Sequence, residues 1–302
     1  MKILSYWNLE STDELLPLLD QAFGWSFNPR TFQQFVKIDP RLKNSEVGFC
    51  AVDDGRILGY VGVMDLTTRA LDGSVERVGG LYGVATLPGH TRRGICTSLM
   101  VHAHEYFRDR GYRFSLLNTS PTIVAYSLYS KLGYLEAFDR LSTYKVVGNK
   151  KPKRLKTGKL DFGRLSRIYD GYVKGKSGLV VRDEAYFRML KKVEWLAGHQ
   201  NLFSENGYAL YKKEKDLIRI SELVAPNAEE MNYLIGLLEE QAKDIVLCRT
   251  ILDKTLLRVF RSRSYMILEK SHGVMMYKPL SSDASFRQAY GDRFFMSSLD
   301  HF

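Results

Sequence analysis

The residues with the most evident chemistry form a loop that joins a predicted strand to a predicted helix. Two arginines stand beside a glycine there, within the run Val84-Ala85-Thr86-Leu87-Pro88-Gly89-His90-Thr91-Arg92-Arg93-Gly94-Ile95-Cys96-Thr97-Ser98-Leu99. The first amides of a helix are unpaired and lie at the positive end of its dipole, so a helix beginning after Gly94 is suited to bind a phosphate group. Arg92 and Arg93 add charge, and the hydroxyls of Thr97 and Ser98 can donate hydrogen bonds. The alternative is an ordinary basic helix start.

Other residue types that often carry chemistry do not form a recognisable site in the sequence. The loop is not the phosphate loop of nucleotide-hydrolysing enzymes, because no G-K-S/T follows. His102 and His104 are two residues apart, so they lie on different faces of a helix and are a poor metal pair. The three cysteines, Cys50, Cys96 and Cys248, are far apart and form no CxxC motif. We therefore expect neither a metal site nor a disulfide framework.

The arginine loop resembles the coenzyme A pyrophosphate loop of the GNAT acetyltransferases, R/Q-x-x-G-x-G/A after a strand ending in V-x-x-x-P. Alignment on Gly94 places Thr91 at the Arg/Gln position, where His90, Arg92 and Arg93 supply the missing charge, and Cys96 at the second small residue. A second segment resembles the N-x-x-A-x-x-L-Y-x-K-L-G-F/Y motif of the same superfamily, with Thr where Asn is usual: Thr122-Ile123-Val124-Ala125-Tyr126-Ser127-Leu128-Tyr129-Ser130-Lys131-Leu132-Gly133-Tyr134. The two motifs lie in the expected order, and the resemblance covers Met1 to about Val147.

The resemblance implies acetyl-CoA (coenzyme A) as the cofactor. Backbone groups of Val84, Ala85 and Thr86 would bind its pantetheine arm like an added strand, and a free amide there would polarise the acetyl carbonyl. Ser120, at the end of the next strand, would also contact the cofactor. The implied phosphate-binding residues are Arg92, Arg93, Gly94, Ile95, Cys96 and Thr97.

Acetyl transfer from a thioester to an amine needs a neutral amine, a polarised carbonyl, a base for the amine proton and an acid for the thiolate. Tyr129 matches the tyrosine that GNAT enzymes commonly use as this acid, and a phenol of pKa ~10 is suited to protonating a thiolate. The alternative is that Tyr129 is a core aromatic residue. Tyr126, three residues earlier, is the better core candidate of the two.

A narrower resemblance is to the Eis-like (enhanced intracellular survival) acetyltransferases. It rests on 84–94, on Leu117-Asn118-Thr119-Ser120, on 129–134 and on Val180-Val181-Arg182-Asp183-Glu184-Ala185-Tyr186-Phe187. Members of that family carry two GNAT-like domains and a third, sterol-carrier-like domain, for which 302 residues are too few.

In Eis-like enzymes the C-terminal carboxylate of the chain is the base, which is the carboxylate of Phe302 here. The tail that precedes it is aromatic, whereas chain ends are usually polar: Phe294-Phe295-Met296-Ser297-Ser298-Leu299-Asp300-His301-Phe302. The alternative is that these aromatic residues only pack the tail onto the second domain. Glu76 and Asp65, on predicted strands, are other candidate bases that would act through water.

Hydrophobic periodicity and turn residues predict the elements that position these residues. Helices are expected over 12–23 and 29–38, after Pro88-Gly89 to about 110, and over 122–132; strands are expected over 47–52, 57–66, 75–86 and 114–117, with a final pair over 134–147. On the long helix, Ile95, Leu99, Ala103 and Phe107 share one face. This mixture predicts an α+β fold with mostly antiparallel, mixed sheets flanked by helices.

The second half repeats the strand–helix–strand–helix–strand order of 75–147. Its expected strands are 207–211, 217–224, 244–249, 265–269 and 273–277, and its expected helices are 227–241 and 253–261. This order predicts tandem GNAT (acyl-CoA N-acyltransferase) folds. The second copy is degenerate, because its loop Val224-Ala225-Pro226-Asn227-Ala228-Glu229-Glu230 has no glycine and carries two carboxylates. We expect one cofactor site per chain and a second domain that shapes the acceptor site.

Length and composition agree with two globular domains, since 45% of the 302 residues are hydrophobic and 26% are charged. We expect a catalytic domain over 1–148, a basic linker over 149–160 and a degenerate domain over 161–302 with a C-terminal tail over 281–302. The formal charge of +10 suits an anionic partner, which could be nucleic acid, a membrane surface or a nucleotide cofactor; the alternative is a solvated basic surface with no particular partner. Much of the excess lies in the linker, which has no aromatic residues to stack on bases, so nucleic acid is not expected.

No segment has the length and hydrophobicity of a signal peptide or a membrane span, so a cytoplasmic location is expected. The sequence therefore predicts an N-acetyltransferase whose partners are acetyl-CoA and a primary amine: a small-molecule or aminoglycoside-like amine, or a peptide or protein amine. The alternative is a catalytically silent acyl-CoA-binding regulatory protein. The acceptor and the oligomeric state, including a homo-oligomer, stay open.

Overall fold

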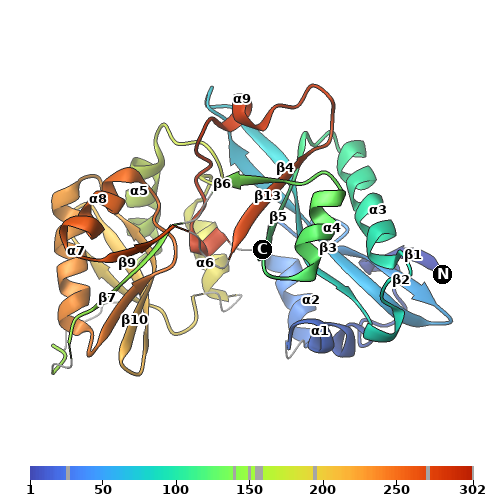
Figure 1. The fold of residues 1–302 in the computed structure, drawn as a ribbon, viewed down its shortest axis with the longest axis horizontal. Helices are drawn as coiled ribbons and strands as arrows, with labels where there is room; N and C mark the ends of the chain where they lie inside the picture. Colours follow the sequence, from blue (N-terminus) through green and yellow to red (C-terminus); the bar gives the residue numbers. More distant parts are fainter. Residues whose placement is uncertain are drawn as a thin grey trace. The chain divides into compact units, whose positions relative to one another are not determined.

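The computed structural model describes residues 1–24, 28–138, 141–148, 151–153, 159–192, 196–269 and 273–300. The chain forms two compact units (Figure 1). The first contains Met1–Ala137 and Val274–Gly291, and the second contains Phe138–Gly273 and the segment that starts at Asp292. Among the described residues, no helix is long and apolar enough to cross a membrane.

The first unit is built on a mixed sheet in which seven strands are described. Their spatial order is β1 (Lys2–Ser5), β2 (Gly48–Asp53), β3 (Arg56–Arg69), β4 (Val75–Thr86), β5 (Phe114–Thr119), β13 (Val274–Pro279) and β6 (Leu135–Phe138). Neighbouring strands are antiparallel from β1 to β4, whereas β4 and β5 are parallel. The predicted hairpin is confirmed, with Asp54 and Gly55 at positive φ in its turn.

The helices of the first unit are α1 (Leu15–Phe23), α2 (Pro29–Ile38), α3 (Ile95–Asp109), α4 (Val124–Lys131) and α9 (Phe286–Tyr290). The predicted face of α3 is confirmed, because Ile95, Leu99, Ala103 and Phe107 are all buried. A Cβ on Gly79 of β4 would come within 2.5 Å of the Phe107 ring, so this glycine lets α3 pack closely on the sheet.

The second unit is built on a sheet with the spatial order β12 (Met266–Leu268), β7 (Ser142–Val146), β11 (Ile245–Cys248), β10 (Leu217–Val224), β9 (Tyr208–Glu214) and β8 (Gln200–Phe203). Here β10 and β11 are parallel, as β4 and β5 are in the first unit. Its helices are α5 (Phe162–Val173), α6 (Glu184–Lys192), α7 (Ala228–Gln241) and α8 (Lys254–Ser262). Both units are α+β, as the sequence predicts.

Two strands belong to a different sheet from the one that their position in the sequence suggests. The sequence predicts that both strands of the pair over 134–147 belong to the first domain, but β6 joins the first sheet and β7 the second. The predicted strand over 273–277 forms β13, which pairs antiparallel with β5 of the first sheet from Val274 opposite Thr119 to Pro279 opposite Phe114. The compact units therefore differ from the contiguous domains expected over 1–148 and 161–302.

Candidate cofactor and acyl-transfer site

The central feature of the first unit is a pair of parallel strands that separate before they end. β4 pairs with β5 only from Gly79 opposite Ser115 to Leu81 opposite Leu117, although β4 continues to Thr86. The register between β3 and β4 shifts just after this point, where Gly83 adopts a φ of +59°. The end of β4 therefore keeps its β3 partner but has no partner from β5.

Two hydroxyl groups near this opening lack a hydrogen-bond partner among the described residues. They are the buried Oγ1 atoms of Thr86, at the end of β4, and Thr119, at the end of β5. Buried polar groups are almost always hydrogen-bonded in proteins, so each exception calls for an explanation. A polar ligand between the two strand ends would give both hydroxyls a partner. The backbone of Val84, Ala85 and Thr86 lies along the same open stretch.

The loop after β4 leads into α3 with its first amides free. A short 3-10 helix (Pro88–His90) is followed by Gly94, which has a φ of +78° and precedes Ile95 without a side-chain cap. This positive φ favours glycine. No acidic residue lies in the first turn of α3, and the first amide to find a partner within the helix is that of Ser98, which donates to the Gly94 carbonyl at 2.9 Å. The amides of Ile95, Cys96 and Thr97 are thus available to an anion.

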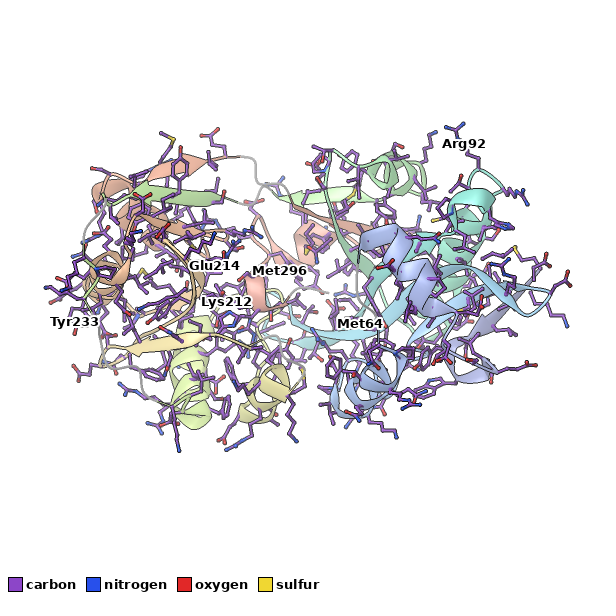
Figure 2. All side chains as sticks on the ribbon, turned by 90° about the horizontal axis from the view of Figure 1, so that it is seen from below. Met64, Arg92, Lys212, Glu214, Tyr233 and Met296 are labelled. Atoms are coloured by element: carbon purple, nitrogen blue, oxygen red, sulfur yellow. The ribbon has the colours of Figure 1, made fainter. Side chains whose placement is uncertain are left out.

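Arg92 and Arg93 are exposed in this loop, and neither forms an ion pair with a described carboxylate. Figure 2 shows the Arg92 side chain extending outward from the loop. Arg92 also adopts a φ of +61°, which is uncommon for a residue with a side chain. Charge, free amides and an open strand end therefore lie in one continuous segment.

Tyr129 lies on α4, only 6% exposed, within the hydrophobic core of the first unit. Its ring meets that of Tyr134 edge-on at 6.1 Å, and no described residue forms a hydrogen bond with its hydroxyl. Burial, with a smaller contribution from Cys96 at the start of α3, raises the pKa of Tyr129 well above its usual value. The phenol therefore keeps its proton at neutral pH. Tyr129 and the start of α3, predicted separately, are neighbours.

The expectation that Tyr126 is the better core residue is wrong. Tyr126 is partly exposed and its hydroxyl donates to Glu136 at 2.5 Å, while Tyr129 is the buried one. The reason is the position of the sheet, which the spacing of two tyrosines on one short helix does not reveal. Ser120 lies after β5, where its Oγ is 2.8 Å from that of Thr122 and accepts a hydrogen bond from the Thr122 amide. It holds the turn that leads into α4.

Asp65 and Glu76, the two alternative bases that the sequence suggests, both form ion pairs with arginines. Asp65 is 5% exposed and pairs with Arg110 at 3.1 Å and Arg77 at 3.6 Å. Glu76 is held through both oxygens by Arg113, at 2.8 and 2.9 Å, and accepts a hydrogen bond from Tyr290.

Their position also argues against a role for these two carboxylates. Glu76 precedes Val84 by eight residues on the same strand, about 26 Å at the rise of an extended chain. Asp65 lies opposite Gly79, on the far side of the paired stretch. Neither carboxylate therefore lies at the open end of β4. Phe302, the base that the family resemblance implies, lies outside the described residues.

A buried chain of hydrogen bonds that was not predicted from the sequence involves Tyr134, the ring in contact with Tyr129. The Tyr134 hydroxyl is 2.9 Å from His104 Nε2 and 2.7 Å from Ser115 Oγ. Burial lowers the pKa of His104 to about 3, so the imidazole is neutral. The helical spacing of His104 with the buried residues of α3 was the available signal. No group of three potential metal ligands occurs in the described part of the chain, and His102 instead packs edge-on against Phe49.

The corresponding loop of the second unit satisfies its own helix start. The Asn227 side chain caps α7 by accepting from the Glu230 amide at 2.9 Å, and Glu229 and Glu230 lie in the first turn. Glu230 in turn accepts a hydrogen bond from the Asn206 amide. The positive end of α7 is therefore already matched by carboxylates, unlike that of α3.

The first of these two loops lies in the part of the chain that is similar to a known family. Residues 5–137 match the family model described as an acetyltransferase (GNAT) domain. The match covers less than half of the 302 residues, so this part of the chain is similar to a GNAT acetyltransferase domain. A search of curated proteins finds no match.

Solved structures similar to the chain extend the likeness to both units. A GCN5-related N-acetyltransferase from Kribbella flavida has a TM-score of 0.69 at 18% identity, covering 92% of this chain and 72% of that one. One from Anabaena variabilis has a TM-score of 0.67 at 16% identity, with coverages of 93% and 73%. Eis1 from Mycobacterium abscessus has a TM-score of 0.56 at 18% identity, with coverages of 83% and 70%. The predicted tandem GNAT fold and its likeness to Eis are thereby confirmed.

Proposed function

We propose that this protein is an acetyl-CoA-dependent N-acetyltransferase that acetylates a primary amine. The observation that carries the proposal is the open end of β4, which leads directly into the free amides and arginines at the start of α3, with the protonated Tyr129 beside that helix. These features match a slot for the acyl arm, an anion site for the cofactor's phosphates and a proton donor for the thiolate.

The residues fit acetyl-CoA. An extended arm can pair with the backbone of Val84, Ala85 and Thr86, and its polar groups can satisfy the buried hydroxyls of Thr86 and Thr119. The pyrophosphate matches the amides of Ile95, Cys96 and Thr97 and the exposed charges of Arg92 and Arg93. When bound, acetyl-CoA supplies an activated acetyl group. Ser120 shapes the turn beside this slot.

The protein's own groups then have distinct tasks. An unpaired amide at the end of β4 polarises the acetyl carbonyl. As the amine nitrogen forms its bond to the carbonyl carbon and the carbon–sulfur bond breaks, Tyr129 gives its hydroxyl proton to the sulfur. The proton lost by the amine goes to a base, for which we propose the C-terminal carboxylate of Phe302. With Asp65 and Glu76 paired to arginines, no other carboxylate considered from the sequence is free to take it.

We assign the second unit a role in selecting the acceptor rather than in binding the cofactor. The start of α7 is capped by Asn227 and carries two glutamates in its first turn, so it offers no room or charge for a pyrophosphate. One cofactor site per chain follows from this difference between α3 and α7.

The experiment that tests this function is thiol release from acetyl-CoA in the presence of kanamycin, spermidine, a peptide with a free N-terminus and a lysine-containing peptide. We expect release that depends on one of these amines and a matching acetylated product by mass spectrometry. Binding of coenzyme A without release for every amine would instead support a silent acyl-CoA-binding protein.

Replacing Arg92 and Arg93 together with Ala is expected to weaken coenzyme A binding by about 2–4 kcal/mol, taking ~1.5–3 kcal/mol for each charge-assisted contact less solvent screening. Calorimetry should show this loss at a stoichiometry of one site per chain, and pantetheine, which has no phosphate, should be affected much less.

The matched control is the double change Arg258→Ala and Arg261→Ala, which removes the same charge from the exposed face of α8. It should leave coenzyme A binding unchanged. Equal losses for coenzyme A and pantetheine would show that Arg92 and Arg93 serve the fold instead of the phosphates.

A further inference from the structure

The second unit contains a cavity of about 390 Å³ between the start of α5, the end of α6 and β8. This volume is within the range of small-molecule sites, about 300–1,000 Å³. The residues that the argument below uses are Lys159, Leu160 and Phe162 around the start of α5, Lys191 at the end of α6, and His199 and Asn201 at the beginning of β8. All of them belong to the second unit, so the cavity is formed within one compact body.

Asn201 is the lining residue whose chemistry calls for a ligand. It is 3% exposed, and its Nδ2 group has no hydrogen-bond partner among the described residues. Buried side-chain amides are almost always hydrogen-bonded in folded proteins, so an unpaired donor needs an explanation. A ligand with an acceptor oxygen in the cavity would give Asn201 its missing partner.

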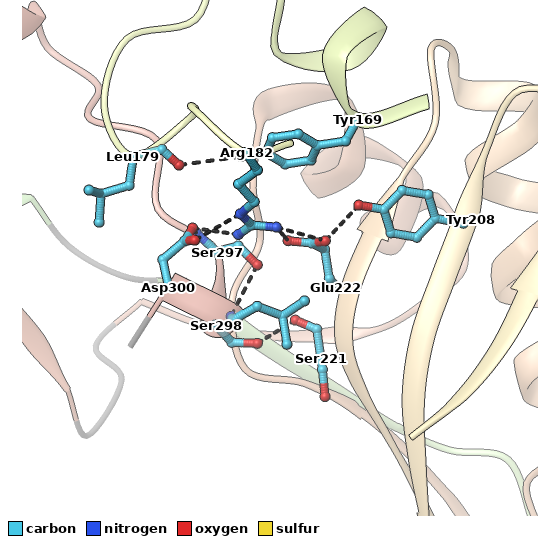
Figure 3. Close-up of polar contacts among 10 residues, drawn as sticks. Tyr169, Leu179, Arg182, Tyr208, Ser221, Glu222, Ser297, Ser298 and Asp300 are labelled. Atoms are coloured by element: carbon cyan, nitrogen blue, oxygen red, sulfur yellow. Dashed lines mark hydrogen bonds and ion pairs between the residues drawn. The ribbon is translucent and has the colours of Figure 1, made fainter. Parts of the chain in front are cut away.

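The strand register shows that Asn201 projects toward the side of the sheet on which α5 lies. Asn201 is opposite Leu210 of β9, and Leu210 is opposite Glu222 of β10. Residues opposite each other in antiparallel strands share one face of the sheet. On that face Glu222 pairs with Arg182 at 2.9 Å, and Arg182 lies over the ring of Tyr169 of α5 at 4.5 Å (Figure 3). Glu222 therefore has partners on this face, whereas the Asn201 amide has none among the described residues.

The charge around the cavity is positive. Lys159 and Lys191 line it, and no carboxylate is among the described residues that do so. Burial, together with the positive charges of Lys212 and Lys191, lowers the pKa of His199 to about 4. The imidazole is therefore neutral at neutral pH, and its Nε2 is 2.8 Å from the Ser221 hydroxyl. These charges favour an anion in the cavity.

The types of the lining residues favour a phosphate over a carboxylate. Lysine binds phosphate as a point charge, whereas the planar fork of arginine is the best match for a carboxylate. No arginine is among the described residues that line the cavity. Leu160 and Phe162 add an apolar surface, which suits a ring or hydrocarbon group attached to the phosphate.

We propose that this cavity binds a small organic phosphate, with Lys159 and Lys191 supplying the positive charge and Asn201 Nδ2 donating a hydrogen bond to a phosphate oxygen. Phe162 contacts the apolar part of the ligand. The site lies wholly in the second unit and shares no residue with the proposed cofactor site at α3. It gives the second unit a binding role of its own, and the proposal does not rest on the proposed function.

The test is calorimetry with phenyl phosphate on the full-length protein, with coenzyme A present at saturation to occupy the anion site at α3. We expect one additional site per chain. Phenol, which has the same ring without the phosphate, should bind at least about tenfold more weakly. The double change Lys159→Gln and Lys191→Gln should weaken the binding of phenyl phosphate by at least about tenfold, because it removes both lining charges.

A second variant, Asn201→Leu, removes the unpaired donor and keeps a side chain of similar size. It should weaken the binding of phenyl phosphate without lowering the Tm, because no described partner is left unsatisfied. The matched control is Lys192→Gln, which removes an exposed charge from the same helix as Lys191 but does not line the cavity. It should leave the affinity for phenyl phosphate unchanged.

Three results would overturn the proposal. One is the absence of any binding heat with phenyl phosphate at 10 mM. Another is wild-type affinity in both the double lysine variant and Asn201→Leu, which would place the ligand elsewhere. The third is benzoate binding as tightly as phenyl phosphate, which would show that the cavity does not select a phosphate. If wild type acetylates no amine, the proposed function fails, while these binding results still decide whether the cavity is a phosphate site.

Discussion

Replacing Tyr129 with Phe is expected to lower kcat by about 10²–10⁴-fold, the range for loss of a general acid or base, while the fold and acetyl-CoA binding persist. Phe keeps the ring that packs against Tyr134 in the core. The hydroxyl has no hydrogen bond to a described residue, so its removal leaves no buried partner unsatisfied. The change therefore removes the hydroxyl proton of Tyr129 and keeps the packing of its ring.

The matched control for Tyr129→Phe is Tyr126→Phe, which removes a hydroxyl from the same helix. That hydroxyl bonds to the exposed Glu136 and lies outside the core. We expect Tyr126→Phe to retain the wild-type kcat. Thermal unfolding should be measured for both variants, because a lower rate that follows a lower Tm would indicate a packing role. An unchanged kcat in Tyr129→Phe would remove Tyr129 from the mechanism.

The pH profile gives a second check on Tyr129. Because burial raises its pKa, the phenol stays protonated at pH values where a free phenol would already ionise. The active, protonated form should therefore persist above pH ~10, the ordinary phenol value. A loss of activity that begins below that pH and disappears in Tyr129→Phe would show a phenol that ionises more easily than a buried one.

The part of the site that the sequence predicts best is the part made from consecutive residues. The arginines, the glycine and the helix start lie within one short run, and local conformation alone brings them together. Gly94 adopts the left-handed φ that explains glycine there, and α3 buries the face that its 3.6-residue spacing indicates. The proposed proton donor, Tyr129, could be related to this loop only because the resemblance supplied a second motif.

The exchange of strands between the sheets could not be predicted from local patterns. Residues 135–138 and 142–146 are both short and β-forming, and nothing in their composition says that the first joins one sheet and the second another. β13 reaches β5 from more than a hundred residues away, as the pairing of Val274 with Thr119 shows. Strand patterns indicate that a strand exists, whereas its partner depends on the whole fold.

Buried charges are equally hidden in the sequence. Arginine is mostly exposed in proteins, so Arg182 gives no sign of being buried against Glu222 and Asp300. The same holds for Asp65 and Glu76, which look like candidate bases until their arginine partners are seen. Both carboxylates are paired with arginines, so neither is free to act as the base.

Adding four or five residues after Phe302 is expected to abolish most turnover, by about 10²–10⁴-fold, without affecting acetyl-CoA binding. The extension moves the terminal carboxylate away while every side chain stays in place, and the anion site at α3 is untouched. The deficit should shrink as pH rises, because more of the amine is then neutral and needs no base. Steady-state rates from pH 6 to 10, with calorimetry for acetyl-CoA, measure both effects.

The same residues added before Met1 are the control for the extension. The terminal amine there pairs with the exposed Asp53 and belongs to no part of the proposed site, so kcat should match wild type. If the aromatic tail only packs, the C-terminal extension should lower the Tm and leave the rate per folded molecule unchanged. Full activity in the extended protein would exclude the carboxylate as base.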